Sequence, residues 1–91
     1  MKIIFLDSTY DDLEWFHQYY SLVFPEGLES ALKQFDRINE LLVLNPLLGV
    51  LDEEGLRKFT IPKTPFSYYY RITNTHIEVL RVWDDRREGD I

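Results

Sequence analysis

Apolar residues recur at helical spacing in two stretches of the first half of the chain. They predict a first helix over residues 9–24 and a second over residues 28–44. Pro25 and Gly27 end the first helix, and Pro46 ends the second because the residue before a proline avoids the helical region. The short connection predicts that the two helices form an antiparallel hairpin.

The residues before the first helix fit a capping box, in which a hydroxyl and a carboxylate three positions later bind the first free backbone N–H groups. Ser8 with Asp11 gives one register, and Thr9 with Asp12 gives a second. Either register predicts that the helix begins close to Thr9.

Runs of β-branched and aromatic residues predict one strand before the hairpin, at residues 2–6, and three after it, at 56–61, 66–73 and 77–83. Residues 47–55 are predicted to form a loop. This order of elements predicts one α+β domain over residues 1–91, in which an antiparallel twisted sheet packs on an N-terminal helical hairpin. The other face of such a sheet is left for solvent or for a ligand.

Composition narrows the class of protein. Hydrophobic residues make up 45% of the 91 residues, which is a normal globular balance, and the chain has no cysteine, which excludes disulfides and thiolate chemistry. No apolar run approaches the roughly 18 residues that cross a bilayer, and the apolar start of the chain is read as a strand rather than a signal peptide. We therefore expect no membrane partner, and the absence of cysteine fits a reducing compartment.

Charge is unevenly distributed along the chain. Residues 1–54 contain 11 acidic and 3 basic residues, whereas residues 55–91 contain 5 acidic and 7 basic residues, for a total of −6. The overall acidity opposes nonspecific binding of nucleic acid, although the cations near the C-terminus could still form a local positive site. The alternative is that the acidity serves solubility alone.

Several short motifs in this order resemble those of RelE/ParE toxins. They are Pro-Leu-Leu-Gly at 46–49, Gly-Leu-Arg at 55–57, Tyr-Arg-Ile at 70–72, the strand at 77–82, and the pair Arg86-Arg87. The similarity extends over nearly the whole chain, including the order of helices and strands.

The resemblance implies the toxin of a type II toxin–antitoxin system, of the kind also linked to plasmid stabilisation. Such toxins are cytoplasmic and are held inactive by an antitoxin encoded alongside them. We expect no cofactor for this chain. RelE-like members are RNA interferases that cleave messenger RNA on the ribosome, whereas ParE-like members inhibit DNA gyrase. The resemblance leaves open a homodimer or a hetero-oligomer with the antitoxin.

Three departures favour the ParE-like branch. Ser67 stands where RelE-like toxins have an arginine, Asp84 stands where several relatives have a histidine, and the residues after Arg87 include no tyrosine. Residues 66–72 match the third strand of ParE-like toxins well.

If the chain cleaves RNA, its cations are the residues that would handle phosphate. These candidates are Arg57, Lys58, Arg71, Arg81 and Arg86. Strand alternation places Arg71 on one face with Ser67 and Tyr69, and it places Arg81 on one face with Ile77, Val79 and Trp83. The alternative for Arg71 and Arg81 is that they pair with Glu78 or other local carboxylates and shield the sheet. The alternative for Arg86 and Arg87 is a solvated run of charge.

Aromatic and arginine side chains, together with one leucine, are the candidates for binding a protein partner, because tryptophan, tyrosine and arginine dominate interface energies. They are Trp15, Tyr19, Leu22, Tyr69, Trp83 and Arg87. Trp15, Tyr19 and Leu22 form a second apolar line on the first helix. That line either packs inside the domain or contacts an antitoxin or a second copy.

No pattern supports a metal site. His17 and His76 lack companion ligands, and the acidic residues 52–54 are best explained as a solvated loop tip. Asp84 lies beside arginines, which should depress its pKa and make it a poor base near neutrality.

The sequence supports three hypotheses of different classes. The first is a gyrase-inhibiting toxin, the second is a metal-independent endoribonuclease acting at the ribosome, and the third is a degenerate protein that binds antitoxin without toxicity.

Overall fold

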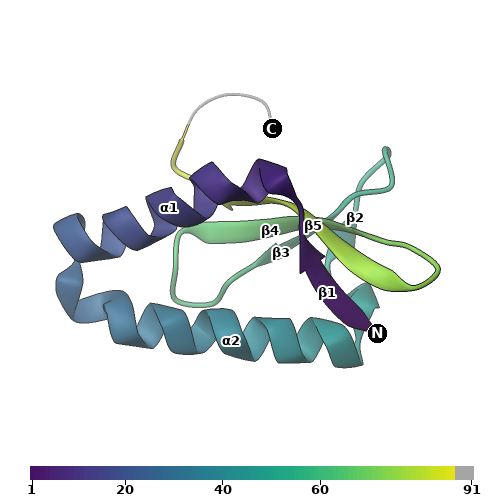
Figure 1. Cartoon of the computed structure of the whole chain (residues 1–91), viewed down its shortest axis with the longest axis horizontal. Helices are drawn as coiled ribbons and strands as arrows, with labels where there is room; N and C mark the ends of the chain where they lie inside the picture. Colours follow the sequence, from purple (N-terminus) through teal and green to yellow (C-terminus); the bar gives the residue numbers. More distant parts are fainter. Residues whose placement is uncertain (88–91) are drawn as a thin grey trace.

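A five-stranded mixed sheet and two helices account for most of residues 1–87, which are the residues that the computed structural model describes (Figure 1). The elements are β1 (Lys2–Phe5), α1 (Tyr10–Gln18), α2 (Leu28–Leu44), β2 (Val50–Leu51), β3 (Arg57–Thr60), β4 (Phe66–Ile72) and β5 (His76–Asp84). The strands lie in the order β1-β5-β4-β3-β2. The predicted α+β class, the helical hairpin and the bounds of α2 are confirmed.

The sheet differs from the prediction at both edges. Strands β3 to β5 are antiparallel as predicted, but β1 pairs in parallel with β5. The intervening helices and strands provide the long crossover that a parallel pair requires. The predicted loop at 47–55 contains a short additional strand, in which Val50 and Leu51 pair with Lys58 and Arg57. Two residues are too few to show an alternating pattern in the sequence.

The first helix is shorter and less regular than predicted. α1 ends at Gln18 and continues directly into a single π-helical segment, Tyr19–Val23, which widens the last turn. The predicted capping box is absent. The Ser8 hydroxyl donates to the carbonyl of Leu80 at 2.6 Å, and the Thr9 hydroxyl donates to that of Leu6 at 2.7 Å, so neither caps the helix.

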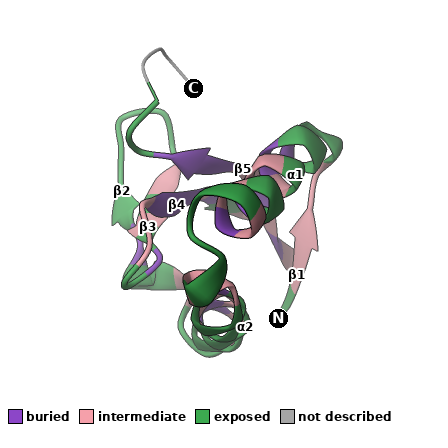
Figure 2. Ribbon diagram, turned by 90° about the vertical axis from the view of Figure 1, so that its left-hand side faces the viewer, coloured by how far each residue is buried: buried purple, intermediate pink, exposed green. Residues whose placement is uncertain are grey.

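An aromatic core fills the space between the sheet and the hairpin. Figure 2 shows buried positions along β4, β5 and the inner sides of both helices. The ring of Phe16 lies 4.7 Å from that of Phe66 and 5.6 Å from that of Phe35, which joins α1, α2 and β4. The buried Tyr68 hydroxyl donates to Asn39 of α2 at 2.6 Å, so the polar end of this ring also has a partner. Neither helix among the described residues is long and apolar enough to cross a membrane.

Candidate functional site: the open face of the sheet

The face of the sheet opposite the helices, here called the open face, carries a row of neighbouring side chains across three strands. Lys58 of β3 pairs with Tyr69 of β4, and Tyr69 pairs with Arg81 of β5. The Lys58 ammonium lies 5.6 Å from the centre of the Tyr69 ring. This row brings together two of the cations that the sequence marked as candidates for phosphate binding.

The predicted face of Arg81 is only partly correct. Arg81 and Trp83 pair with Tyr69 and Ser67 and so lie on the open face, where Trp83 is only 9% exposed, whereas Ile77 and Val79 face the helices and are fully buried. The register between β4 and β5 shifts at Tyr69 and Tyr70, so Leu80 is an extra residue in β5. Such a bulge reverses the alternation of the following side chains, and simple counting along the strand cannot reveal it.

Trp83 lies between two guanidinium groups. Those of Arg81 and Arg87 lie 4.8 and 4.9 Å from the centre of its ring. Arg87 also lies 6.0 Å from the ring of Trp15 on α1. Both distances to Trp83 fall within the range of cation–π attraction. Within residues 1–87, Arg87 forms no ion pair.

Asp12 neutralises Arg81 and joins α1 to β5. The Arg81 guanidinium donates two hydrogen bonds to the carboxylate, at 2.7 and 2.8 Å, and the backbone N–H of Val82 donates a third at 3.0 Å. The Asp12 side chain is only 2% exposed. Hydrogen bonding to Asp12 raises the pKa of Arg81. Local spacing does not predict this role of Asp12, because 69 residues separate it from Arg81.

Asp84 links the end of β5 to α1 through hydrogen bonds. Its carboxylate accepts hydrogen bonds from the Trp15 indole at 3.0 Å and from the Arg86 guanidinium at 2.9 and 2.7 Å. Burial alone would raise the pKa of Asp84, but the hydrogen bonds from Arg86 and Trp15 outweigh it and lower the pKa to about 2. Asp84 is therefore ionised at neutral pH, and the predicted depression of its pKa is confirmed. Arg86 in turn lies 4.1 Å from the centre of the Tyr19 ring.

A second carboxylate covers Ser67, the residue that replaces the arginine of RelE-like toxins. The buried Ser67 hydroxyl donates to Asp85 at 2.5 Å and shares a 3.1 Å hydrogen bond with Thr60. Asp85 also forms an ion pair with Lys58 at 3.3 Å. Although desolvation lowers the pKa of Lys58, interactions with Tyr69 and Asp85 raise it overall, which keeps the ammonium charged.

Arg71 and Arg57 lie away from this cluster. Arg71, near the end of β4, forms an exposed 2.6 Å ion pair with Glu78. The hydrogen bond from His76, followed by that from Arg71, lowers the pKa of Glu78. Arg57 alternates with Lys58 along β3 and donates to the carbonyl of Gly49 at 2.8 Å, which holds the turn after α2.

The structure thus groups the candidate residues into a main cluster and separate positions. The cluster contains Trp15, Tyr19, Lys58, Tyr69, Arg81, Trp83, Arg86 and Arg87. Leu22 lies outside it, at the end of the hairpin, where it is 79% exposed. The pair of Arg71 with Glu78 is the one that the alternative from the sequence named, and Arg81 pairs with the distant Asp12 instead. Lys58 and Arg86 also pair with carboxylates, whereas Arg57 donates to a backbone carbonyl.

The cluster offers aromatic rings and fixed guanidinium groups but little acid–base chemistry. Asp84 and Asp85 are engaged by cations, and Ser67 is bound to Asp85. Within residues 1–87, no three acidic, histidine or cysteine side chains come together as metal ligands. Such a surface is suited to binding a protein or stacking on a base.

Comparison with solved structures gives an informative similarity, whereas the comparisons of sequence do not. No family model and no curated protein matches the chain. Among solved structures, a chain from the "Chromosomal ParDE TA system from P. aeruginosa" superposes with a TM-score of 0.71. The match covers 90% of this chain and 92% of that chain at 27% sequence identity.

Proposed function

This chain is a ParE-like member of the RelE/ParE superfamily, and from that membership we propose that it is the toxin of a type II toxin–antitoxin system whose target is DNA gyrase. Its immediate partner would be a cognate antitoxin, and both partner and target place it in the cytoplasm. Support for the toxin assignment comes from the similarity to a ParDE chain over nine-tenths of the sequence.

The observation that favours a binding inhibitor over a nuclease is the stack of Arg81, Trp83 and Arg87 beside Trp15. Tryptophan and arginine are the side chains that contribute most to protein interfaces. Asp84 is a poor general base near neutrality, because its pKa is about 2. The cluster therefore suits recognition of a protein surface better than proton transfer.

The test is supercoiling of relaxed plasmid by purified gyrase in the presence of the purified chain. We expect supercoiling to fall as the chain is added. Lys63→Asn should inhibit as well as the unaltered chain and serves as the control for later variants that remove a cation. Lys63 is an exposed cation in the β3–β4 loop, and asparagine tolerates its positive φ of 64°. Unchanged supercoiling at a large excess of folded protein would exclude gyrase as the target.

One observation favours ribosome-dependent RNA cleavage as a second candidate. The row of Lys58, Tyr69 and Arg81 places two cations on either side of an aromatic ring on the open face. Such a row could contact phosphate and stack on a base. Loss of defined transcripts only during active translation, abolished by Lys58→Ala, would support it. Expression without antitoxin and without growth arrest would instead indicate a degenerate antitoxin-binding protein.

A further inference from the structure

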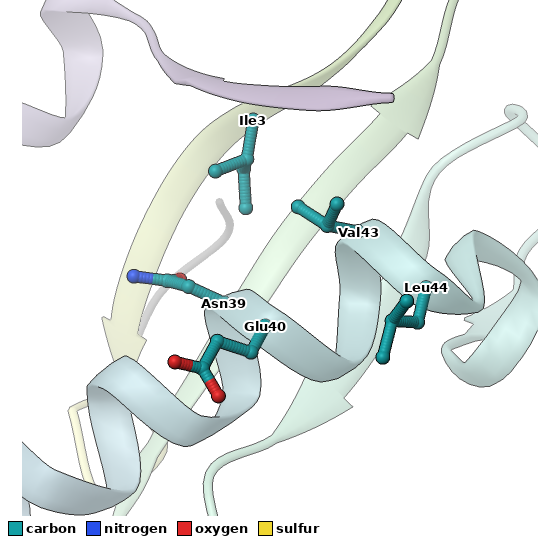
Figure 3. Close-up of a pocket in the computed structure, with 5 residues that line it drawn as sticks. All are labelled: Ile3, Asn39, Glu40, Val43 and Leu44. Atoms are coloured by element: carbon teal, nitrogen blue, oxygen red, sulfur yellow. The ribbon is translucent and has the colours of Figure 1, made fainter.

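The surface from the last turn of α2 to the end of β2, here called the apolar edge, carries no charge. Residues 41–51 contain no acidic or basic side chain. Five of their large apolar side chains are exposed by 40% or more, namely Leu44, Leu47, Leu48, Val50 and Leu51. Figure 3 shows Val43 pointing toward Ile3 of β1 and Leu44, in the last turn of α2, pointing away from it. A contiguous apolar surface of this kind indicates a site of protein contact.

Strand β2 presents one side of its backbone at the edge of the sheet (Figure 2). Among residues 1–87 it pairs only with β3. The backbone N–H of Asp52 donates to the carbonyl of Leu56 at 2.8 Å, so residue 52 faces the β3 side. Because successive residues of a strand direct their N–H and C=O groups to opposite sides, those of Leu51 point away from β3. Folded proteins usually protect such an edge with charged side chains, and β2 has none.

We propose that two copies of this chain pair through β2 as an antiparallel dimer with two-fold symmetry. The N–H and C=O groups of Leu51 would bond to those of Leu51 in the second copy, with the two Cα atoms about 5.5 Å apart. A two-fold axis brings the same surface of each copy together, so the leucines of the apolar edge would cover one another. Since β2 has only two residues, burial of these side chains would contribute more to binding than the hydrogen bonds.

Charge complementarity favours a second copy as the occupant of the apolar edge. The turn after β2 is acidic, and its Glu53 and Glu54 are exposed. At the other end of β2, the half-buried Arg57 guanidinium donates to the carbonyl of Gly49 at 2.8 Å. Antiparallel pairing centred on Leu51 brings the acidic turn of each copy to the Gly49 end of the other. Opposite charges therefore meet at both ends of the interface, on either side of its apolar centre.

Sedimentation equilibrium of the full chain over a series of concentrations tests the dimer. We expect a monomer–dimer equilibrium with a dissociation constant in the micromolar range, because the interface is small. Leu51→Lys places a cation against its own copy at the centre of the interface and should weaken the dimer at least about thirtyfold. Leu22→Lys is the matched control, since Leu22 is 79% exposed at the end of the helical hairpin and the change in charge is the same. A chain that stays monomeric up to about 0.5 mM, or equal losses with both variants, would overturn the proposal.

Because the chain has no cysteine, single cysteine variants can test the register of the pair. Residue 51 would face residue 51 of the second copy, within the separation of about 4.4–6.8 Å between Cα atoms that a disulfide requires. Residue 50 would instead face residue 52, so its two copies would be too far apart. On mild oxidation Leu51→Cys should form a linked dimer, whereas Val50→Cys and the exposed control Leu22→Cys should remain largely monomeric.

Equal linking of Leu51→Cys and either of the other variants would refute pairing through β2. Neither experiment uses gyrase, growth or an antitoxin, and the dimer does not rest on the proposed toxin function. A failure here therefore leaves the toxin assignment standing.

Discussion

Tyr70 closes the turn after α2 around Gly49. The Tyr70 hydroxyl accepts a hydrogen bond from the backbone N–H of Gly49 at 2.8 Å and donates one to the carbonyl of Pro46 at 2.7 Å. Burial raises the pKa of Tyr70, so the hydroxyl remains a donor at neutral pH. A Cβ on residue 49 would lie 2.7 Å from this hydroxyl, which explains the glycine by close approach. Two motifs that carry the resemblance to RelE/ParE toxins, at 46–49 and 70–72, thus meet at one structural contact.

Removing that hydroxyl should destabilise the fold. Tyr70→Phe leaves the buried Gly49 N–H and the half-buried Pro46 carbonyl without this partner, and we expect a loss of about 1–3 kcal/mol in the free energy of unfolding. Urea denaturation measures it. Tyr10→Phe, at a position that is 66% exposed, should change stability little. Equal stability of the two variants would show that solvent replaces the Tyr70 contact.

The ion pair of Asp12 and Arg81 should contribute more to the free energy of unfolding than the Tyr70 hydroxyl does. Asp12→Asn removes the charge that neutralises a largely covered guanidinium, 28% exposed, and weakens the bond to the Val82 N–H. Breaking a buried pair from one side costs about 3 kcal/mol. Thermal or urea unfolding measures the change. The control is Asp11→Asn at the exposed neighbouring position, and a similar small effect of both variants would contradict the expected role of Asp12.

The local features of this fold were predictable, and the long-range ones were not. The bounds of α2 follow from a continuous apolar stripe and a proline, and β3, β4 and β5 follow from alternation within about one residue at most ends. The depressed pKa of Asp84 was also predictable, because Arg86 is only two residues away.

The predictions that were wrong concern features that depend on contacts between distant parts of the chain. The parallel pairing of β1 with β5 and the pair of Asp12 with Arg81 join residues that are about 70 positions apart. Local spacing suggested a capping role for Asp12, whereas tertiary contact with Arg81 and Val82 turned its carboxylate inward. The bulge at Leu80 reversed the expected face of Arg81 for the same kind of reason.

Stability should depend on pH through Asp84. Its pKa is about 2 in the fold and 3.8 when unperturbed, so its ionised form contributes about 2 kcal/mol that is present above about pH 4. Because the folded pKa is the lower one, this contribution is lost as the pH falls from about 4 to about 2. Asp84→Asn should therefore be less stable than the unaltered chain near neutrality, with a difference that shrinks on acidification.

Denaturant unfolding of both proteins at a series of pH values across that window measures the difference directly. Comparing the two proteins at each pH removes the contribution of the other carboxylates, including Glu78, whose pKa is also lowered. A difference that stays constant down to about pH 2 would mean that Asp84 is not the group that titrates.

The last prediction concerns the stack on Trp83. Arg87→Ala removes one of its two guanidinium neighbours and also the contact with Trp15, at a residue that is exposed and forms no ion pair within residues 1–87. We expect a loss of less than about 1 kcal/mol in stability, because exposed cation–π contacts are weak. If the stack is an interface hot spot, the same change should cost about 2 kcal/mol of binding, which is about thirtyfold in the concentration that inhibits gyrase.

Supercoiling assays on Arg87→Ala and on Lys63→Asn, each checked by thermal unfolding, separate a role in binding from a role in folding. Lys63→Asn removes the same charge from the β3–β4 loop, so it reports any effect of net charge alone. Full inhibition by Arg87→Ala would show that the stack on the open face is not part of the surface that binds gyrase. Parallel losses with both variants would indicate long-range electrostatic attraction rather than contact, because steering depends on total charge and not on which cation carries it.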